Sequence, residues 1–328
     1  MNPIRRRSLL QVSAAALPLS VAGKWAFAQD RFPSKPITLI VPQPAGGDAD
    51  VVCRSLQKKM QDVLGQPVVI DNRGGAGGNI GTALGAKAAP DGYTLTFVNQ
   101  GTMALNPSLY PNAGYKVESL APVTWLTSID LVIVAHPSVP AGNLKEFLEL
   151  ARKEPGRHTY GTAGNGSANH LAGEMLKSMA KVDFTHVPYK GGGPAIIALL
   201  GGEISIAVAF PLAALPHVRS GKLKALAVTG KQRAKALPDV PTVAESGVSG
   251  YEFVSWMGLA VPRGTPDPIV QTLHAAAAAA LKEKDVADRL SAGMTEPVGA
   301  GPKEFGDLIS REGARWSKMI KQFGMKID

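Results

Sequence analysis

The chain has 328 residues, of which 45% are hydrophobic and 19% are charged, so it is long enough for two ordinary domains, and disorder, collagen and coiled coil are excluded. The formal net charge is +9, but Arg5, Arg6, Arg7 and Lys24 precede every acidic residue. The remaining 31 basic and 26 acidic residues give +5, spread along the chain without clustering, which argues against nucleic acid as a partner and favours an anionic solute.

The N-terminus has the three parts of an export signal. Arg5–Arg7 forms the charged part, residues 9–22 the apolar part, and Ala26–Ala28 the small-x-small cleavage site. We therefore predict cleavage near Ala28 and a periplasmic mature protein. The twin arginines before Ser8 leave Sec and Tat export both open. No later stretch is apolar for long enough to span a membrane, so the mature chain is not expected to be membrane-spanning.

Short apolar runs alternate with helical patterns in the first part of the chain. The run 37–41 is rich in β-branched residues, which favours a strand. Val52, Leu56, Met60 and Val63 recur at helical spacing. The predicted strands are 37–41, 67–71 and 93–98, and the predicted helices are 49–64 and 79–89. This alternation indicates a parallel sheet with helices on both faces.

The same alternation begins again near residue 131. The second unit has predicted strands at 131–135, 159–162, 184–187, 204–210 and 223–228, and predicted helices at 143–154, 167–179 and 194–200. A stretch rich in proline and glycine, 236–250, leads to a strand at 253–261. Helices at 267–281, 284–290 and 302–323 then need a sheet to cover, and the first unit supplies one. We therefore predict domain 1 from 29–129 plus 251–328, and domain 2 from 130–250, after the signal peptide 1–28.

Glycine-rich loops follow the predicted strands and open helices in both units. Ligands bind beyond the carboxyl ends of parallel strands. Glycine lets the backbone approach a ligand, and the free N–H groups of a helix's first turn favour an anion. Any one such loop can be an ordinary tight turn, but three from both units favour a shared anion site. The predicted ligand-binding residues are Gly46, Gly47, Asp48, Asp50, Asn99, Gly101, Thr102, Gly164, Asn165, Gly166, Ser167, His170, Tyr189 and Phe210.

Catalytic, nucleotide and metal motifs are missing from the sequence. The loops fit neither G-x-G-x-x-G nor the P-loop, and H-E-x-x-H is absent, so we expect no cofactor and no metal. The single cysteine, Cys53, is expected to be a buried apolar side chain. Ser167 is not in a nucleophile elbow and is expected to cap a helix or contact the ligand. His170 can be structural or a contact, and Asp48 and Asp50 can be caps or contacts.

Several segments, in order and at matching spacing from about residue 31 to the C-terminus, resemble the Bug family, the TctC-like solute receptors of tripartite tricarboxylate transporters. These segments are 32–37, 65–69, 77–81, 89–94, 164–167, 170–174, 186–191 and 236–242. The resemblance implies an α/β, type II-like periplasmic binding protein fold. In that fold each of two domains is a Rossmann-like mixed or parallel sheet flanked by helices, with the ligand cleft between them.

The resemblance also implies a function. Members of the family close around dicarboxylates, amino acids or aromatic acids, with loops matching Gly46–Gly47 and Gly164–Ser167 on the ligand carboxylate. It further implies delivery to a membrane permease of the TctA/TctB kind. Binding rather than catalysis is expected, because the sequence offers no convergent acid, base and nucleophile. A sensory receptor for a membrane signalling protein is the alternative, an enzyme on the same scaffold is a weaker one, and a monomer is expected.

Two departures from the family pattern bear on specificity. The family's first loop usually reads Pro-Gly-Gly-Gly-Thr-Asp, whereas residues 45–50 of this chain lack the threonine hydroxyl and add Asp48. Many members have an aspartate after a second-domain strand where this chain has Phe210. We expect Phe210 to make the second-domain wall more apolar, and the exchange of acids to change which end of a ligand is gripped.

Overall fold

The computed structural model describes residues 32–322, so the predicted signal peptide and cleavage site lie outside the described residues. The strands are β1 (Ile37–Val41), β2 (Val68–Asn72), β3 (Thr94–Asn99), β4 (Leu120–Asp130), β5 (Val132–Ala135), β6 (Thr159–Thr162), β7 (Thr185–Pro188), β8 (Ile206–Ala209), β9 (Lys224–Val228), β10 (Val254–Pro262) and β11 (Thr295–Ala300). They form a six-stranded sheet, β11-β4-β10-β3-β1-β2, and a five-stranded sheet, β7-β6-β8-β5-β9. We call the first sheet with its helices the first lobe, and the second sheet with its helices the second lobe.

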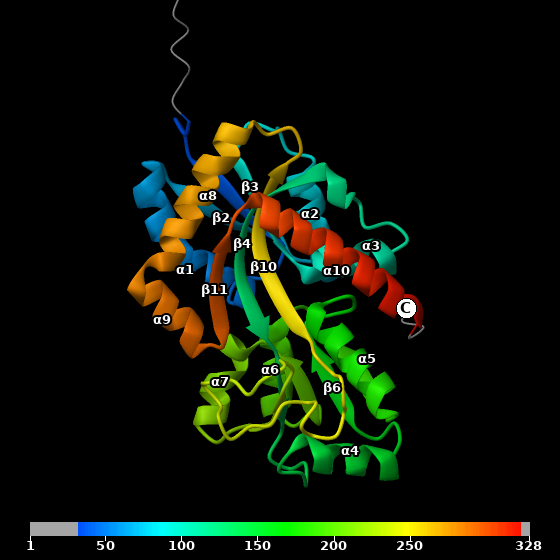
Figure 1. The fold of residues 1–328 in the computed structure, drawn as a ribbon. Helices are drawn as coiled ribbons and strands as arrows, with labels where there is room; N and C mark the ends of the chain where they lie inside the picture. Colours follow the sequence, from blue (N-terminus) through cyan, green and yellow to red (C-terminus); the bar gives the residue numbers. More distant parts are fainter. Residues whose placement is uncertain (1–31, 323–328) are drawn as a thin grey trace, which may run out of the picture. The chain divides into compact units, whose positions relative to one another are not determined.

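The helices lie on both faces of each sheet (Figure 1). The α-helices are α1 (Asp48–Leu64), α2 (Asn79–Ala86), α3 (Asn106–Leu109), α4 (Leu144–Lys153), α5 (Ala168–Ala180), α6 (Gly192–Leu200), α7 (Pro211–Arg219), α8 (Asp267–Lys282), α9 (Lys284–Ala292) and α10 (Pro302–Gln322). Short helical turns are η1 (Ala76–Gly78), η2 (Gly101–Leu105) and η3 (Val117–Ser119). In the first lobe α1, α8 and α9 cover one face, and α2, α3 and α10 cover the other. The predicted α/β class is confirmed.

The predicted parallel core of the first lobe is present, but the sheets as wholes are mixed. β1 is parallel to β2 and to β3. Right-handed crossovers through α1 and α2 bring the chain back each time, so that every strand starts at the same end of the sheet. β10 returns from the second lobe in the opposite direction and is antiparallel to both β3 and β4. In the second lobe β6 is parallel to β7 and β8, and β5 is antiparallel to β8 and β9.

Helix α1 shows how the apolar spacing becomes packing. Val52, Leu56 and Met60 are buried against the first lobe, as their spacing predicts. Val63, the fourth residue of that spacing, is 48% exposed near the end of the helix. Gly65 ends the helix with φ of 66°, and its N–H donates to the carbonyl oxygen of Gln61.

The sequence prediction missed β4, β11 and α7, and proline explains all three omissions. Pro122 lies in β4 beside a register shift against β10, and Pro297 lies in the edge strand β11. Both places tolerate the missing backbone N–H of proline. In a sequence, however, a proline argues against a central strand, so neither segment was predicted as one. Helix α7 begins with Pro211 and contains Pro216, which breaks the usual helical signal. The predicted helix 79–89 is also shorter, since α2 ends at Ala86.

Thr229 joins the two places where the chain passes between the lobes. The first passage is at Leu131, between β4 and β5, and the second is at Phe253, just before β10. The backbone N–H of Leu131 donates to Thr229 Oγ1 (2.8 Å), and that hydroxyl donates to the carbonyl oxygen of Phe253 (2.7 Å). The two passages are therefore fastened side by side. The assignment of 29–129 plus 251–328 and of 130–250 to separate domains stays a prediction.

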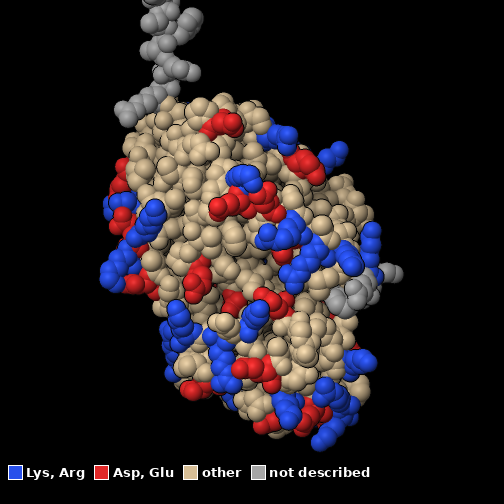
Figure 2. All heavy atoms as spheres, viewed as in Figure 1, with Lys and Arg blue, Asp and Glu red and all other residues tan. Residues whose placement is uncertain are grey.

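Charged side chains of both signs are mixed over the face in Figure 2, without a single-sign stripe. Within residues 32–322 none of the helices has the length and hydropathy needed to cross a bilayer. The same residues contain no group of histidine, cysteine and acidic side chains arranged to hold a metal ion. Cys53 is buried and unpaired, as predicted.

Trp316 is among the largest fully buried side chains and fixes α10 to the first lobe. Its ring packs on Phe253 at 5.2 Å between centroids, and its Nε1 donates to Glu312 (3.0 Å). Trp316→Ala should lower the free energy of unfolding by about 3–5 kcal/mol, because it leaves a cavity and strips buried Glu312 of a donor. Urea unfolding followed by circular dichroism measures this. Lys318→Ala, at an exposed position of the same helix, is the control and should change stability by less than about 0.5 kcal/mol.

Candidate functional site

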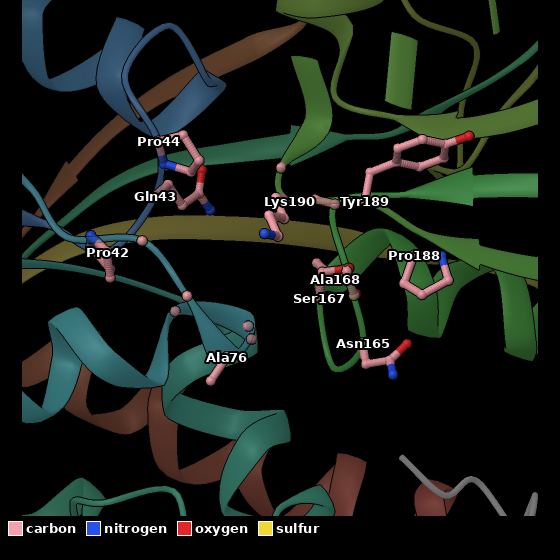
Figure 3. A pocket seen from close by; sticks show the side chains of 18 of the residues that line it. Pro42, Gln43, Pro44, Ala76, Asn165, Ser167, Ala168, Pro188, Tyr189 and Lys190 are labelled. Carbon is pink, nitrogen blue, oxygen red and sulfur yellow. The ribbon is translucent and has the colours of Figure 1, made fainter. Parts of the chain in front are cut away.

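A cavity of about 790 Å³ lies between the two lobes, where loops from the carboxyl ends of both sheets face each other (Figure 3). Such a volume suits a small molecule, and most of the wall is apolar side chain or glycine backbone. The lining residues are Pro42, Gln43, Pro44, Gly74, Gly75, Ala76, Gly77, Gly78, Asn99, Gly101, Tyr110, Ala163, Gly164, Asn165, Ser167, Ala168, Pro188, Tyr189, Lys190, Gly191 and Phe210.

The second-lobe loop between β6 and α5 is held in shape by its own hydrogen bonds. Gly164 has φ of 121°, a conformation that favours glycine. Ser167 caps α5: its Oγ accepts from the backbone N–H of His170 (3.4 Å) and donates to the carbonyl oxygen of Gly164 (2.5 Å). The predicted cap role of Ser167 is therefore seen directly, on a residue that also lines the cavity.

His170 supports this loop from behind and does not line the cavity. Its Nδ1 accepts from the backbone N–H of Gly166 (3.2 Å), and its ring stacks on His186 with centroids 4.1 Å apart. Burial lowers the pKa of His170 and, together with the neighbouring His170 and Lys177, lowers that of His186 to about 3. Both rings therefore stay neutral at neutral pH, which keeps Nδ1 of His170 available as an acceptor.

The first-lobe loop between β1 and α1 is anchored by Asp50. Its carboxylate accepts from the backbone N–H of Gly46 (2.9 Å), from Nε of Arg54 (2.9 Å) and from Nδ2 of Asn72 (3.1 Å). Burial alone would raise the pKa of Asp50, but these donors lower it below its ordinary value. Gly46 and Gly47 lie in this loop but do not line the cavity. Gln43 and Pro44, from the same loop, do line it.

A second first-lobe turn follows β3. The side chain of Asn99 accepts from the backbone N–H of Thr102 (3.0 Å), and the backbone N–H of Asn99 donates to Thr102 Oγ1 (3.2 Å). Asn99 and Gly101 line the cavity, whereas Thr102 is buried beneath it. The reciprocal bonds hold Gly101 at the cavity wall.

The lobes touch at the cavity through the Tyr110 hydroxyl and through glycine backbone. Tyr110 of the first lobe donates its hydroxyl to the carbonyl oxygen of Asn165 in the second (2.8 Å). A Cβ on Gly77 would lie 2.8 Å from that same carbonyl oxygen, and one on Gly191 would lie 3.4 Å from Cγ of Pro44. The described conformation therefore has the lobes in contact around Tyr110, Gly77 and Gly191.

Asp48 belongs to the first lobe, but its side chain lies against the second lobe, outside the cavity lining. A Cβ on Gly192, at the start of α6, would lie 3.4 Å from Asp48 Oδ2. Burial raises the pKa of Asp48 to about 6, and the backbone N–H groups of Asp48 and Ala213 partly offset that rise. Only 5% of Asp48 is exposed, and its Oδ1 has no hydrogen-bond partner.

Lys190 is the one formally charged side chain among the described residues that line the cavity. Figure 3 shows its ammonium group extending from the second lobe toward Gln43 of the first. Lys190 is the second residue after β7, in the loop that opens α6. The cavity therefore combines glycine backbone, a helix N-terminus with the Ser167 cap, and one positive charge, which together suit an anion.

The structure brings half of the predicted site residues to the cavity. Those that line it are Asn99, Gly101, Gly164, Asn165, Ser167, Tyr189 and Phe210; those that do not are Gly46, Gly47, Asp48, Asp50, Thr102, Gly166 and His170. Phe210 is 7% exposed and presents an apolar wall. Whether each residue contacts the ligand stays a prediction.

Sequence reasoning left out several lining residues. The turn 74–78 follows β2, and its glycines are a signal of the same kind as those of the other loops. Lys190 lies in the glycine-rich segment 188–193, where a lone cation beside glycines was the available sign. Tyr110 carried no signal, because only the tertiary fold brings α3 to Asn165.

The chain matches known proteins over most of its length. A sequence model of the "Tripartite tricarboxylate transporter family receptor" matches residues 52–325. The protein BugT of Bordetella pertussis is 37% identical over 300 residues, which cover 91% of this chain and 92% of BugT.

Solved structures of similar proteins have the same fold. Rpa4515 of R. palustris, determined with adipate, gives a TM-score of 0.87 at 34% identity, covering 90% of this chain and 99% of that one. MatC (Rpa3494) from Rhodopseudomonas palustris, with bound malate, gives a TM-score of 0.84 at 35% identity, covering 88% and 100%. The expected periplasmic binding protein fold is thereby confirmed.

Asp48→Asn should stabilise the protein at neutral pH and lose that effect in acid. Since the folded-state pKa of about 6 exceeds the ordinary 3.8, the folded protein binds the proton more tightly and the wild type loses stability as pH rises from about 4 to 6. Above pH 6 the cost is on the order of 1–3 kcal/mol, which the variant avoids. Urea unfolding of both proteins between pH 4 and 8 measures the difference.

Asp50→Asn is the matched control. It removes an acid from the same helix turn, but the pKa of Asp50 is lowered where that of Asp48 is raised. It should destabilise the protein at neutral pH, and the difference should shrink as pH falls through the folded-state pKa of Asp50. An Asp48→Asn variant that is less stable than wild type at pH 8 would contradict the burial assigned to Asp48.

Proposed function

This chain belongs to the tripartite tricarboxylate transporter family of receptors, and we propose that it captures a small carboxylate-bearing solute in the cavity between its lobes. A dicarboxylate, an amino acid or an aromatic acid would fit this description. The observation that carries the proposal is the interlobe cavity, which holds Lys190 and the Ser167-capped start of α5. Adipate and malate in the solved relatives support a carboxylate.

The residues divide the work of binding in a physically simple way. The ammonium of Lys190 neutralises the carboxylate, and the backbone N–H groups at the start of α5 offer hydrogen bonds to its oxygens. Phe210 and Tyr189 supply apolar surface for the rest of the solute. His170 holds the loop in place through Gly166.

The recipient of the solute would be a membrane permease of the TctA/TctB kind. Export to the periplasm by the N-terminal signal would place the mature protein on the side where such a permease takes up solute. Lobe closure about the Thr229-linked passages would present a different surface in the loaded form, which a permease can recognise. This function needs only closure of the lobes around the solute and its later release. It involves no chemical step.

The most direct test is mass spectrometry of small molecules released from the purified mature protein. The expected result is one carboxylic acid at close to one equivalent per chain. A thermal-shift panel of carboxylates then ranks ligands, because a solute bound only by the folded state raises Tm. A mature protein that releases no acid, and whose Tm no carboxylate raises, would contradict the proposal.

Lys190→Gln should weaken binding of the best carboxylate from that panel by about 10- to 100-fold, since a charge-assisted hydrogen bond is lost. Isothermal titration calorimetry measures Kd for the variant and the wild type. Lys222→Gln, which removes an exposed lysine from the same lobe away from the cavity, is the control and should leave Kd unchanged. An unchanged Kd for Lys190→Gln would exclude Lys190 as the counter-charge.

A further inference from the structure

Asp48 is a first-lobe carboxylate buried against the second lobe. It begins α1, yet its Oδ2 would lie 3.4 Å from a Cβ on Gly192 at the start of α6, and the backbone of Ala213 in the first turn of α7 lies near it. Both α6 and α7 are nine residues long and begin beside the cavity. The side chain thus joins the lobes at a point where two helix N-termini come together.

Helix N-termini attract anions, because their first N–H groups lack partners within the helix and the helix dipole adds positive potential. Beside the starts of α6 and α7 the nearby anion is the carboxylate of Asp48, which belongs to the protein itself. Only 5% of Asp48 is exposed, and its Oδ1 has no hydrogen-bond partner. A buried carboxylate with an unsatisfied oxygen is costly, which indicates that this position serves binding rather than stability.

The position of Asp48 relative to the cavity follows from its neighbours. Gly191, directly before Gly192, lines the cavity, and so does Phe210, which caps the start of α7. Asp48 therefore lies immediately behind the wall formed by Gly191 and Phe210. Among the described residues that line the cavity, Lys190 is the one charge available to oppose an anionic solute.

The charges near the cavity allow one carboxylate and discourage a second. A first carboxylate can pair with Lys190. A second would meet the apolar ring of Phe210 and would be repelled by the Asp48 carboxylate behind it, in a site of low dielectric. A far end that is uncharged avoids both costs.

We propose that Asp48 sets the charge of the accepted solute, by placing a buried negative charge behind the cavity wall of Gly191 and Phe210 and so excluding a solute with two carboxylates. This inference rests on the proposed function and narrows it to monocarboxylates. It sets this chain apart from the relatives solved with adipate and malate, which are dicarboxylates.

The test compares solutes that differ only in the second carboxylate. Isothermal titration calorimetry at pH 7.5 measures Kd of the mature protein for butanoate and succinate, hexanoate and adipate, and benzoate and terephthalate. The wild type should bind the monocarboxylate of the best-bound pair about tenfold more tightly or better. Asp48→Asn removes the charge and Asp48→Gly also empties the space, and each should reduce that ratio at least about tenfold.

Asp62→Asn is the control, because it removes one acid from the exposed side of the same helix, where Asp62 lies 3.5 Å from Lys58. Its Kd ratio should equal that of the wild type. A wild type that binds the dicarboxylates as tightly, or a ratio that Asp48→Asn leaves unchanged, overturns the present inference alone. A wild type that binds none of the six and whose Tm no carboxylate of the thermal-shift panel raises overturns the proposed function itself.

Discussion

The close approach of the two lobes at loops without side chains is the constraint on which the rest of the structure depends. At Gly77, Gly101 and Gly191 a Cβ would lie 2.8 to 3.4 Å from an atom of the facing lobe. Such distances leave no room for a side chain at Gly77 and little at the other two. Bare backbone at the cavity rim lets the lobes meet.

The polar networks behind these loops make their shape independent of a ligand. Asp50 fastens the first loop through Gly46, and His170 fastens the second through Gly166. Because each support is buried and hydrogen-bonded, the two loops are held in shape without a solute, which lowers the ordering cost of binding. Thr229 complements this by joining both interlobe passages through its hydroxyl.

Much of the fold followed from the sequence because local signals agreed with the tertiary structure. The β-branched run of β1, the glycine stop of α1 at Gly65 and the glycine turns after strands each have a local cause. Strand β4 was missed because Pro122 is tolerated only beside its register shift, which depends on pairing with β10.

The site was predictable as a set of loops but not as a set of contacts. Asn99, Gly101 and the turn 164–167 lie where parallel strands end, which a chain-order argument can find. The hydroxyl of Tyr110 on Asn165, and the reach of Asp48 to Ala213, join residues 55 and 165 positions apart. No periodicity encodes such pairs, because they arise only when the two lobes face each other.

The central claim, that the interlobe cavity holds a carboxylate, is tested most directly by a crystal structure of the mature protein grown with its co-purified solute. The account predicts density for a carboxylate within hydrogen-bonding distance of Lys190 Nζ and of the backbone N–H groups at the start of α5. A solute bound elsewhere on the protein, or one whose carboxylate points away from Lys190 and from Ser167, would contradict it.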